Sequence, residues 1–220
     1  MTRVLTIGVL VSGEGTTLDA IAELASGGHL PVHIALVVAD RPHAPAIERA
    51  RRRGLATLVL PSRGVPLEAW ASRLTRELRE RGVELVVLAG FLTILPPAWV
   101  ADWPGRAINL HPALLPRHGG PGFYGARVHE AVLAAGEKET GATVHIVTGE
   151  VDRGPTIAQQ RLEVLPGDTP ASLRERLHPV EVELLAATLR RFADGSLPLP
   201  YVADDRPTPD DRREPAGQSR

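Results

Sequence analysis

Short apolar runs alternate with amphipathic segments through the first half of the chain, and this pattern predicts buried strands separated by helices. Because each strand is followed by a helix, we expect parallel strands joined by right-handed crossovers, with helices on both faces of one sheet. The pattern therefore predicts a doubly wound, Rossmann-like α/β fold. The predicted strands span residues 4–11, 34–39, 57–60 and 85–89, with a further strand that ends at Asn109, and the predicted helices span residues 16–26, 44–53, 67–81 and 97–102.

The order of elements changes after the glycine-rich segment at residues 114–125. Two strand-like runs then follow one another, and the polar connection between them at residues 148–154 is typical of a hairpin. The mostly parallel sheet should therefore end in an antiparallel C-terminal pair. The elements predicted in this part are a helix at residues 126–135, strands at residues 143–147 and 155–164, and a last helix at residues 169–192.

Length and composition fit one domain. With 220 residues, of which 43% are apolar, the chain can bury a full core, and residues 1–203 contain no internal repeat or linker. We therefore predict a single domain over this range. Residues 204–220 are nearly all polar, charged or proline and cannot bury enough surface to offset the entropy of ordering, so we predict a mobile tail.

Composition also bears on the class of function. The absence of cysteine excludes disulfides, a thiolate nucleophile and a cysteine metal site. No apolar run approaches the roughly 20 residues that span a bilayer, and the first residues resemble no secretory leader, so we expect a cytoplasmic protein without membrane contact. The net charge of −1 provides no general attraction to nucleic acid.

The most informative segment is Asn109-Leu110-His111-Pro112, which follows a buried strand. Loops at strand ends often carry chemistry. An amide is a neutral donor and an imidazole a donor that can carry charge, so together they suit an oxygen that gains negative charge during acyl transfer. An isolated motif of this kind more often satisfies backbone groups at a strand end, but the rest of the chain reverses that balance.

A second motif, Ser12-Gly13-Glu14-Gly15-Thr16-Thr17, lies between the first strand and the first helix. Backbone N–H groups at a helix start attract anions and glycines permit close approach, so this is a candidate phosphate site; a structural turn is the alternative. The dinucleotide pattern fails because Leu18 stands where its third glycine is needed, although Asp40 could imitate the ribose-binding acid. Glu14 favours a single phosphate over a polyphosphate.

A third set consists of Thr143, His145 and Asp152. Thr143 and His145 are two apart on a predicted strand and so face the same way, while Asp152 lies in the hairpin that follows. The hairpin could place a carboxylate over the strand end from which Asn109 and His111 emerge. A carboxylate favours a charged imidazole, and the two groups can relay a proton. The alternatives are a turn residue for Asp152 and a structural strand residue for His145.

Five motifs follow one another between roughly residues 3 and 195. They are Gly13-x-Gly15, Leu-Ala-Gly-Phe-Leu-Thr-Ile-Leu at residues 88–95, Asn109-x-His111-Pro112 followed by Leu114-Leu115-Pro116, Gly-Ala-Thr-Val-His at residues 141–145, and Asp152-x-Gly154-Pro155. In type, order and interval they resemble the folate-dependent formyltransferases, and among these the phosphoribosylglycinamide formyltransferase family. The joint occurrence of all five makes this resemblance highly specific.

The resemblance implies that 10-formyltetrahydrofolate donates its formyl group to the amino group of glycinamide ribonucleotide, a step of purine synthesis, without a metal. It also implies that Asn109 and an imidazolium His111 donate to the oxyanion. Asp152 would support the charged His111 and carry the proton that the amine loses. Thr143 and His145 are expected to support this catalytic set.

The resemblance further assigns two binding regions, one for the phosphate and ribose of the substrate and one for the flat pterin of the folate. Thr93 stands where the family often has an arginine, so a charged contact to the folate from this position is in doubt. The alternatives are an exposed helical acid for Glu181 and ordinary core for the apolar residues. The residues assigned to the substrate are Gly13, Gly15, Thr16, Thr17 and Glu181, and those assigned to the folate are Phe91, Leu92, Thr93, Ile94, Leu95, Val100 and Asn109.

Other readings stay open. The loop at residues 117–125 could close over substrate, with Arg117 near a phosphate or the folate tail, or be a simple flexible loop. Methionyl-tRNA formyltransferase and the hydrolase formyltetrahydrofolate deformylase share Asn-x-His…Asp, but each usually carries an additional domain for which this chain has no room. A non-catalytic nucleotide-binding module would explain the glycine-rich motif alone. We expect only small-molecule partners and a monomer or homodimer.

Overall fold

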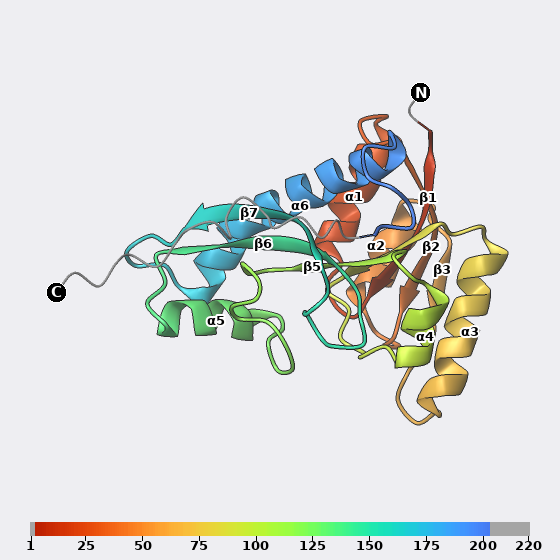
Figure 1. Cartoon of the computed structure of the whole chain (residues 1–220), viewed down its shortest axis with the longest axis horizontal. Coiled ribbons are helices and arrows are strands. Elements are labelled where there is room, and N and C mark those ends of the chain that lie inside the picture. Colours follow the sequence, from red (N-terminus) through yellow and green to blue (C-terminus); the bar gives the residue numbers. More distant parts are fainter. Residues whose placement is uncertain (1–2, 203–220) are drawn as a thin grey trace.

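The sheet is the centre of the fold. A computed structural model of the chain describes residues 3–202, in which seven strands form one sheet in the order β3-β2-β1-β4-β5-β6-β7 (Figure 1). Strands β1 to β5 pair in parallel, whereas β6 runs antiparallel to both β5 and β7. The strands are β1 (Leu5–Val11), β2 (Val32–Ala39), β3 (Thr57–Val59), β4 (Leu85–Ala89), β5 (Ala107–His111), β6 (Glu139–Ile146) and β7 (Thr156–Glu163).

Helices cover both faces of the sheet. On one face α1, α2 and α6 contribute to a single core cluster, and on the other face α3 and α4 form a second cluster around Trp70 and Trp99. Among the described residues no helix is long and apolar enough to span a membrane. The helices are α1 (Thr16–Ser26), α2 (Pro45–Arg52), α3 (Leu67–Glu80), α4 (Pro97–Asp102), α5 (Ala126–Ala134) and α6 (Pro170–Ala193).

Burial on both faces explains the apolar runs that the sequence shows. Along β1, Val9 and Val11 belong to the core cluster under α1, α2 and α6, while Leu10 belongs to the cluster under α3 and α4. All five residues of β4 are buried. A central strand covered on both sides has no solvent-facing position and therefore no polar alternation. The predicted doubly wound α/β fold with an antiparallel C-terminal pair is confirmed.

Three predicted strand starts or ends differ from the structure by two residues or more. The strand expected to begin at residue 143 begins at Glu139, β5 extends through His111, and β2 begins at Val32. The segment at residues 139–142 carries two polar residues and a glycine, so it lacks an apolar run. It becomes a strand because it pairs with residues 160–163 of β7, which is a tertiary effect that local pattern does not record.

Both ends of the described chain are tied to the amino-terminal edge of the sheet. The backbone N–H of Arg3, which precedes β1, donates to the carbonyl of Ala193 at 3.2 Å. The N–H of Tyr201 donates to the carbonyl of Gly105, just before β5, at 2.9 Å. The mobile tail predicted at residues 204–220 lies outside the described residues.

We expect Gly141→Ala to lower the free energy of unfolding by about 1–3 kcal/mol, because a Cβ there would overlap the backbone carbonyl of Gln160 and lie 2.6 Å from a methyl carbon of Leu114. The matched control is Gly149→Ala, where nothing lies within 4 Å of the added carbon. Urea titration followed by circular dichroism measures both. Equal stabilities of the two variants would contradict the close strand packing at Gly141.

Candidate active site

A cavity of about 830 Å³ opens at the carboxyl ends of β1, β4 and β5. Its volume falls in the range of roughly 300–1,000 Å³ that is typical of small-molecule sites. The residues assigned to the catalytic set, the substrate and the folate line it, with two exceptions, and Arg117 also lies outside the lining. Thr143 is fully buried beside it, and Val100 packs against the core cluster of α3 and α4. The cavity is also lined by α6 and by the connection between β6 and β7.

The antiparallel pairing of β5 with β6 sets the positions of four polar side chains. Asn109 lies opposite His145, and His111 lies opposite Thr143. Directly opposed side chains lie on the same face of a sheet and within contact distance. The amide nitrogen Nδ2 of Asn109 accordingly lies 3.0 Å from Nε2 of His145. The motif at residues 109–112 and the motif at residues 141–145, which are far apart in sequence, therefore form one cluster of polar side chains.

Asp152 reaches this cluster from the connection between β6 and β7. The connection leaves β6 beside the start of β5, where the N–H of Val147 donates to the carbonyl of Ala107 at 2.9 Å, and then turns back. Asp152 has a left-handed backbone with φ 55°, which costs about 1–3 kcal/mol in a residue other than glycine. Its Oδ1 accepts from Asn109 Nδ2 at 3.3 Å, and its Oδ2 accepts from the N–H of Gly120 at 3.0 Å.

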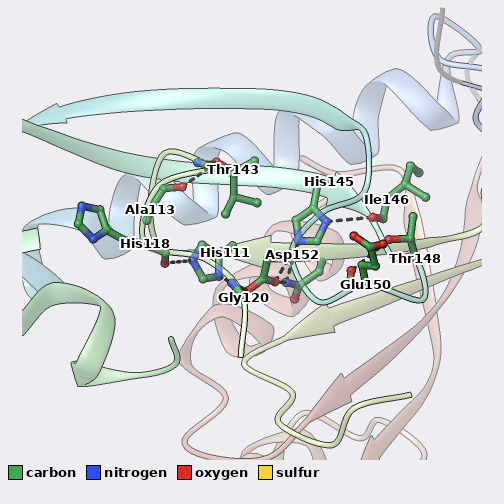
Figure 2. Close-up of polar contacts among 12 residues, drawn as sticks. His111, Ala113, His118, Gly120, Thr143, His145, Ile146, Thr148, Glu150 and Asp152 are labelled. Carbon is green, nitrogen blue, oxygen red and sulfur yellow. Dashed lines mark hydrogen bonds and ion pairs between the residues drawn. The ribbon is translucent and has the colours of Figure 1, made fainter. Parts of the chain in front are cut away.

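Each nitrogen of His111 has a defined neighbour (Figure 2). Nε2 lies 2.8 Å from the carbonyl oxygen of His118 and must be the protonated nitrogen, because a carbonyl only accepts. Nδ1 lies 3.5 Å from Oδ2 of Asp152. The ring is therefore held between the loop that follows β5 and the carboxylate.

The same argument fixes the tautomer of His145. Its Nδ1 lies 2.9 Å from the carbonyl oxygen of Ile146 and so carries the proton (Figure 2). Nε2 is then an acceptor for the Asn109 amide and not a donor to Asp152, although it lies 3.5 Å from Oδ1 of that carboxylate. His145 thus orients Asn109.

Thr143 acts on the loop and does not line the cavity. Its hydroxyl donates to the carbonyl of Ala113 at 2.6 Å (Figure 2). The same oxygen accepts from the N–H of Leu115 at 3.1 Å and from the side-chain amide of Gln159 at 2.9 Å. These contacts fix the start of the loop directly after His111.

Burial and neighbouring polar groups together set the protonation of the central pair. Burial lowers the pKa of His111 below the ordinary value of 6.5, although Asp152 and the His118 carbonyl oppose this shift. Burial also raises the pKa of Asp152, but the neighbouring His145 and His111 rings and the N–H of Gly120 outweigh it, and the net shift is downward. At pH 7 the empty site therefore holds a neutral imidazole beside a carboxylate.

The glycine-rich loop is packed for close approach. Gly15 has φ 69°, and a Cβ there would lie 2.5 Å from the Cβ of Ala46 at the start of α2. At Gly13 nothing lies within 4 Å of an added Cβ, so this position faces open space in the cavity wall. Because Gly15 has no side chain to cap α1, the first N–H groups of that helix remain available to an anion. Thr16 and Thr17 also line the cavity.

The segment after β4 is joined to this loop through Ser12. The N–H of Ser12 donates to the carbonyl of Gly90 at 3.1 Å, and its hydroxyl accepts from the N–H of Leu92 at 2.8 Å. Leu92 and Ile94 are 37% and 60% exposed, whereas Leu95 belongs to the core. The exposed apolar surface offered to a flat ligand therefore comes mainly from two of the predicted wall residues.

Phe91 and Thr93 also make contacts away from the cavity. Phe91 stacks on Trp70 with ring centroids 6.3 Å apart. The Thr93 hydroxyl donates to Oδ2 of Asp40 at 2.6 Å and bonds to Ser62 Oγ at 2.8 Å. Asp40, which could have imitated a ribose-binding acid, is buried beneath Thr93 and does not line the cavity.

Sequence reasoning missed cavity residues on α6, among them Arg174 and His178. Arg174 precedes His178 by four residues and His178 precedes Glu181 by three, so the three side chains share one face of the helix. That spacing was the signal that could have found them. The Nε2 of His178 is buried without a hydrogen-bond partner among the described residues. Burial, with a contribution from Arg174, lowers the pKa of His178.

His129 on α5 was also missed. It is buried at the cavity, and its Nδ1 has no hydrogen-bond partner in the described part of the chain. Burial lowers the pKa of His129 to about 4, with contributions from Arg174 and His111. Glu181 shifts in the opposite sense, since burial raises its pKa to about 7 while Arg174 lowers it in part.

Comparison with known proteins gives a consistent result. Residues 5–189 match the formyl transferase family. The phosphoribosylglycinamide formyltransferase of Escherichia coli (strain K12) is 35% identical over 196 residues, which are 89% of this chain and 90% of that protein. The chloroplastic enzyme of that name from Arabidopsis thaliana is 36% identical, covering 88% of this chain and 69% of that protein.

Longer proteins and solved structures are also similar. The trifunctional purine biosynthetic protein adenosine-3 of Drosophila pseudoobscura pseudoobscura is 38% identical over 87% of this chain, which spans only 14% of that protein. The crystal structure of glycinamide ribonucleotide transformylase 1 from Symbiobacterium toebii superposes with a TM-score of 0.84, at 37% identity and 92% coverage of both chains. These similarities extend over the whole sheet and the cavity at its edge.

We expect Glu181→Gln to change how stability depends on pH. An acid whose pKa is raised to about 7 in the folded protein, against 4.5 in the unfolded chain, stabilises the fold below pH 4.5, and this contribution is lost as pH rises through 7. Relative to the variant, the wild type should lose about 2 kcal/mol of unfolding free energy between pH 5 and pH 8, a value reduced for partial exposure. Urea titrations at both pH values measure this difference.

The control is Glu183→Gln, which changes an exposed position on the same helix. Parallel pH profiles of Glu181→Gln and wild type would contradict the burial of the Glu181 charge.

Proposed function

The chain belongs to the formyl transferase family, and on this basis we propose that it transfers the formyl group of 10-formyltetrahydrofolate to the amino group of glycinamide ribonucleotide, in purine synthesis. The observation that carries the proposal is that Asn109, His111 and Asp152 meet at one cavity beside a glycine-rich loop. Relatives named phosphoribosylglycinamide formyltransferase that are matched over most of their length support it.

The reaction begins when the substrate amine attacks the formyl carbon, and the formyl oxygen becomes an oxyanion as the new C–N bond forms. Nδ1 of His111 lies 3.5 Å from Asp152, at the limit of a hydrogen bond, so a proton there is free to be donated to the oxyanion. Asn109 provides the second donor. The Asn109 amide makes two N–H contacts, and the one to Asp152, at 3.3 Å, is the longer. This N–H leaves Asp152 and donates to the oxyanion.

The proton balance involves the same groups. The attacking amine loses a proton to Asp152, which passes it to Nδ1 of the neutral His111. The oxyanion that develops beside this ring favours the imidazolium, so the charge forms where it is needed. When the bond between the formyl carbon and folate N10 breaks, the proton held by His111 is transferred to N10. The products are the formylated ribonucleotide and tetrahydrofolate.

The substrate occupies the side of the cavity formed by α1 and α6. The free N–H groups at the start of α1, with the hydroxyls of Thr16 and Thr17, hold the phosphate, for which the helix dipole adds attraction. Glu181 accepts from the ribose hydroxyls, and its ionisation is completed when those donors bind. The folate pterin lies against Leu92 and Ile94 at the opposite side.

Two alternative functions use the same catalytic set. A formyltetrahydrofolate hydrolase would direct water to the formyl carbon, and methionyl-tRNA formyltransferase would present a much larger amine. The near-neutral charge favours neither a tRNA nor another nucleic acid. A non-catalytic nucleotide-binding module would leave the contacts among Asn109, His111 and Asp152 without a role. The cytoplasmic location and the monomeric or homodimeric state remain predictions.

The decisive experiment measures formyl transfer to glycinamide ribonucleotide by wild type, Asp152→Asn and His111→Ala. We expect His111→Ala to lower kcat by about 10²–10³, the usual effect of removing one oxyanion donor, and Asp152→Asn to nearly abolish transfer because the amide cannot carry the proton. Both variants should still bind both ligands in calorimetry. Full turnover by either variant would reject the catalytic assignment, and wild-type release of formate without transfer would favour the hydrolase.

Phosphate recognition should depend on the Gly13 backbone. Because Gly13 has open space where a side chain would point, Gly13→Val should fold normally and fill room needed by the ligand. We expect the Kd of the ribonucleotide to rise at least tenfold, while the Kd of a reduced folate analogue changes by less than about twofold. Calorimetry measures both constants. Equal weakening of the two ligands, or no weakening, would show that the loop is only a turn.

A further inference from the structure

Glu137 lies between α5 and β6 and binds two consecutive residues of the loop that follows β5. Its Oε2 accepts from the Arg117 guanidinium at 3.0 Å, and its Oε1 lies 3.1 Å from Nε2 of His118. The side chains of Glu137 and His118 are only 21% and 16% exposed. A polar contact between partly buried side chains is screened less by water and salt than a contact on an open surface.

The loop held by Glu137 contacts both members of the central pair. The carbonyl of His118 accepts from Nε2–H of His111, and two residues later the N–H of Gly120 donates to Asp152. The side chain of His118 therefore binds Glu137 while its backbone binds His111. A displacement of this segment would release the ring and the carboxylate together.

The backbone of the segment requires external support. His118 has a left-handed conformation with φ 53°, which side chains other than glycine rarely adopt. Thr143 and Gln159 hold the start of the loop, near Ala113 and Leu115. Glu137 provides two contacts further along the loop, at Arg117 and His118, next to the backbone groups that bind His111 and Asp152.

We propose that Glu137 is a positioning residue for formyl transfer: by holding Arg117 and His118 it keeps Nε2 of His111 on the His118 carbonyl and turns Nδ1 toward Asp152 and the cavity. Glu137 does not line the cavity, so it acts through the loop. The inference deepens the proposed function and rests on it. It assigns to this carboxylate the orientation of the ring that stabilises the oxyanion.

The first test compares Glu137→Gln and Glu137→Ala with wild type in the formyl transfer assay. We expect kcat to fall about 10- to 100-fold in Glu137→Ala, since small misplacements of a catalytic group have effects of this size, and less in Glu137→Gln. KM for either substrate should change less than about threefold. Glu137→Asp, which restores the charge, should recover part of kcat.

The matched control is Glu139→Gln. Glu139 is exposed, lies two residues further along the chain and pairs with Arg161 on the surface, away from His111. We expect wild-type kcat in this variant. An unchanged kcat in both Glu137→Ala and Glu139→Gln, with an active wild type, would overturn the positioning role. Inactivity of the wild type would instead overturn the proposed function.

A second readout does not need turnover. In the empty protein, ¹⁵N NMR of the His111 ring should show protonated Nε2 and bare Nδ1 above pH 7 in wild type and in Glu139→Gln. In Glu137→Ala the two tautomers should mix, and the pKa of the ring should move up toward 6.5, since burial under the loop is the largest cause of its depression. The charged or titratable groups that face the ring are Asp152, His145, His118 and His129. An unchanged tautomer and pKa in Glu137→Ala would refute the inference even if kcat fell.

Discussion

The antiparallel pairing of β5 with β6 is the constraint on which the site depends. It places Asn109 opposite His145 and His111 opposite Thr143, so that each residue of the Asn-x-His motif has a partner fixed by backbone hydrogen bonds. One partner orients the amide, and the other anchors the loop that covers the imidazole. A slip of β6 by one residue would turn Thr143 and His145 to the other face of the sheet, away from Asn109 and His111. The register of one strand pair thus determines the chemistry at the end of the parallel sheet.

In the site, the carboxylate has hydrogen-bond donors for both of its oxygens, while burial disfavours a charge on the imidazole. Asp152 accepts from two donors and so remains ionised, while burial keeps His111 neutral until negative charge develops beside it. Two residues with left-handed backbones, His118 and Asp152, lie at the same place. Strained backbones persist where surrounding contacts outweigh their cost, and here those contacts are the hydrogen bonds of the catalytic set. The hydrogen bonds that hold the catalytic side chains in place are therefore also the ones that maintain the two strained backbones.

Much of this arrangement could be predicted from the sequence. Apolar runs and alternating helices predicted the doubly wound sheet. The motifs, together with the family that they resemble, singled out many of the residues that line the cavity. The extension of β6 to Glu139 could not be predicted, because polar and small residues become a strand only by pairing with β7. The burial of Asp40 under Thr93 and the hold of Glu137 on His118 also depend on segments distant in sequence. Arg174 and His178 were accessible in principle through helical spacing from Glu181.

The two backbone hydrogen bonds that hold the ends of the described chain lie at the amino ends of the parallel strands. Arg3 is bonded next to the end of α6 and Tyr201 is bonded just before β5, whereas the cavity opens at the carboxyl ends of the strands. Both ends of the described chain therefore lie on the side opposite the reacting groups, away from the opening of the cavity. In the relatives named trifunctional purine biosynthetic protein, the matched region spans 14% to 19% of a much longer chain. Covalent fusion to neighbouring enzymes is thus compatible with the geometry of this sheet.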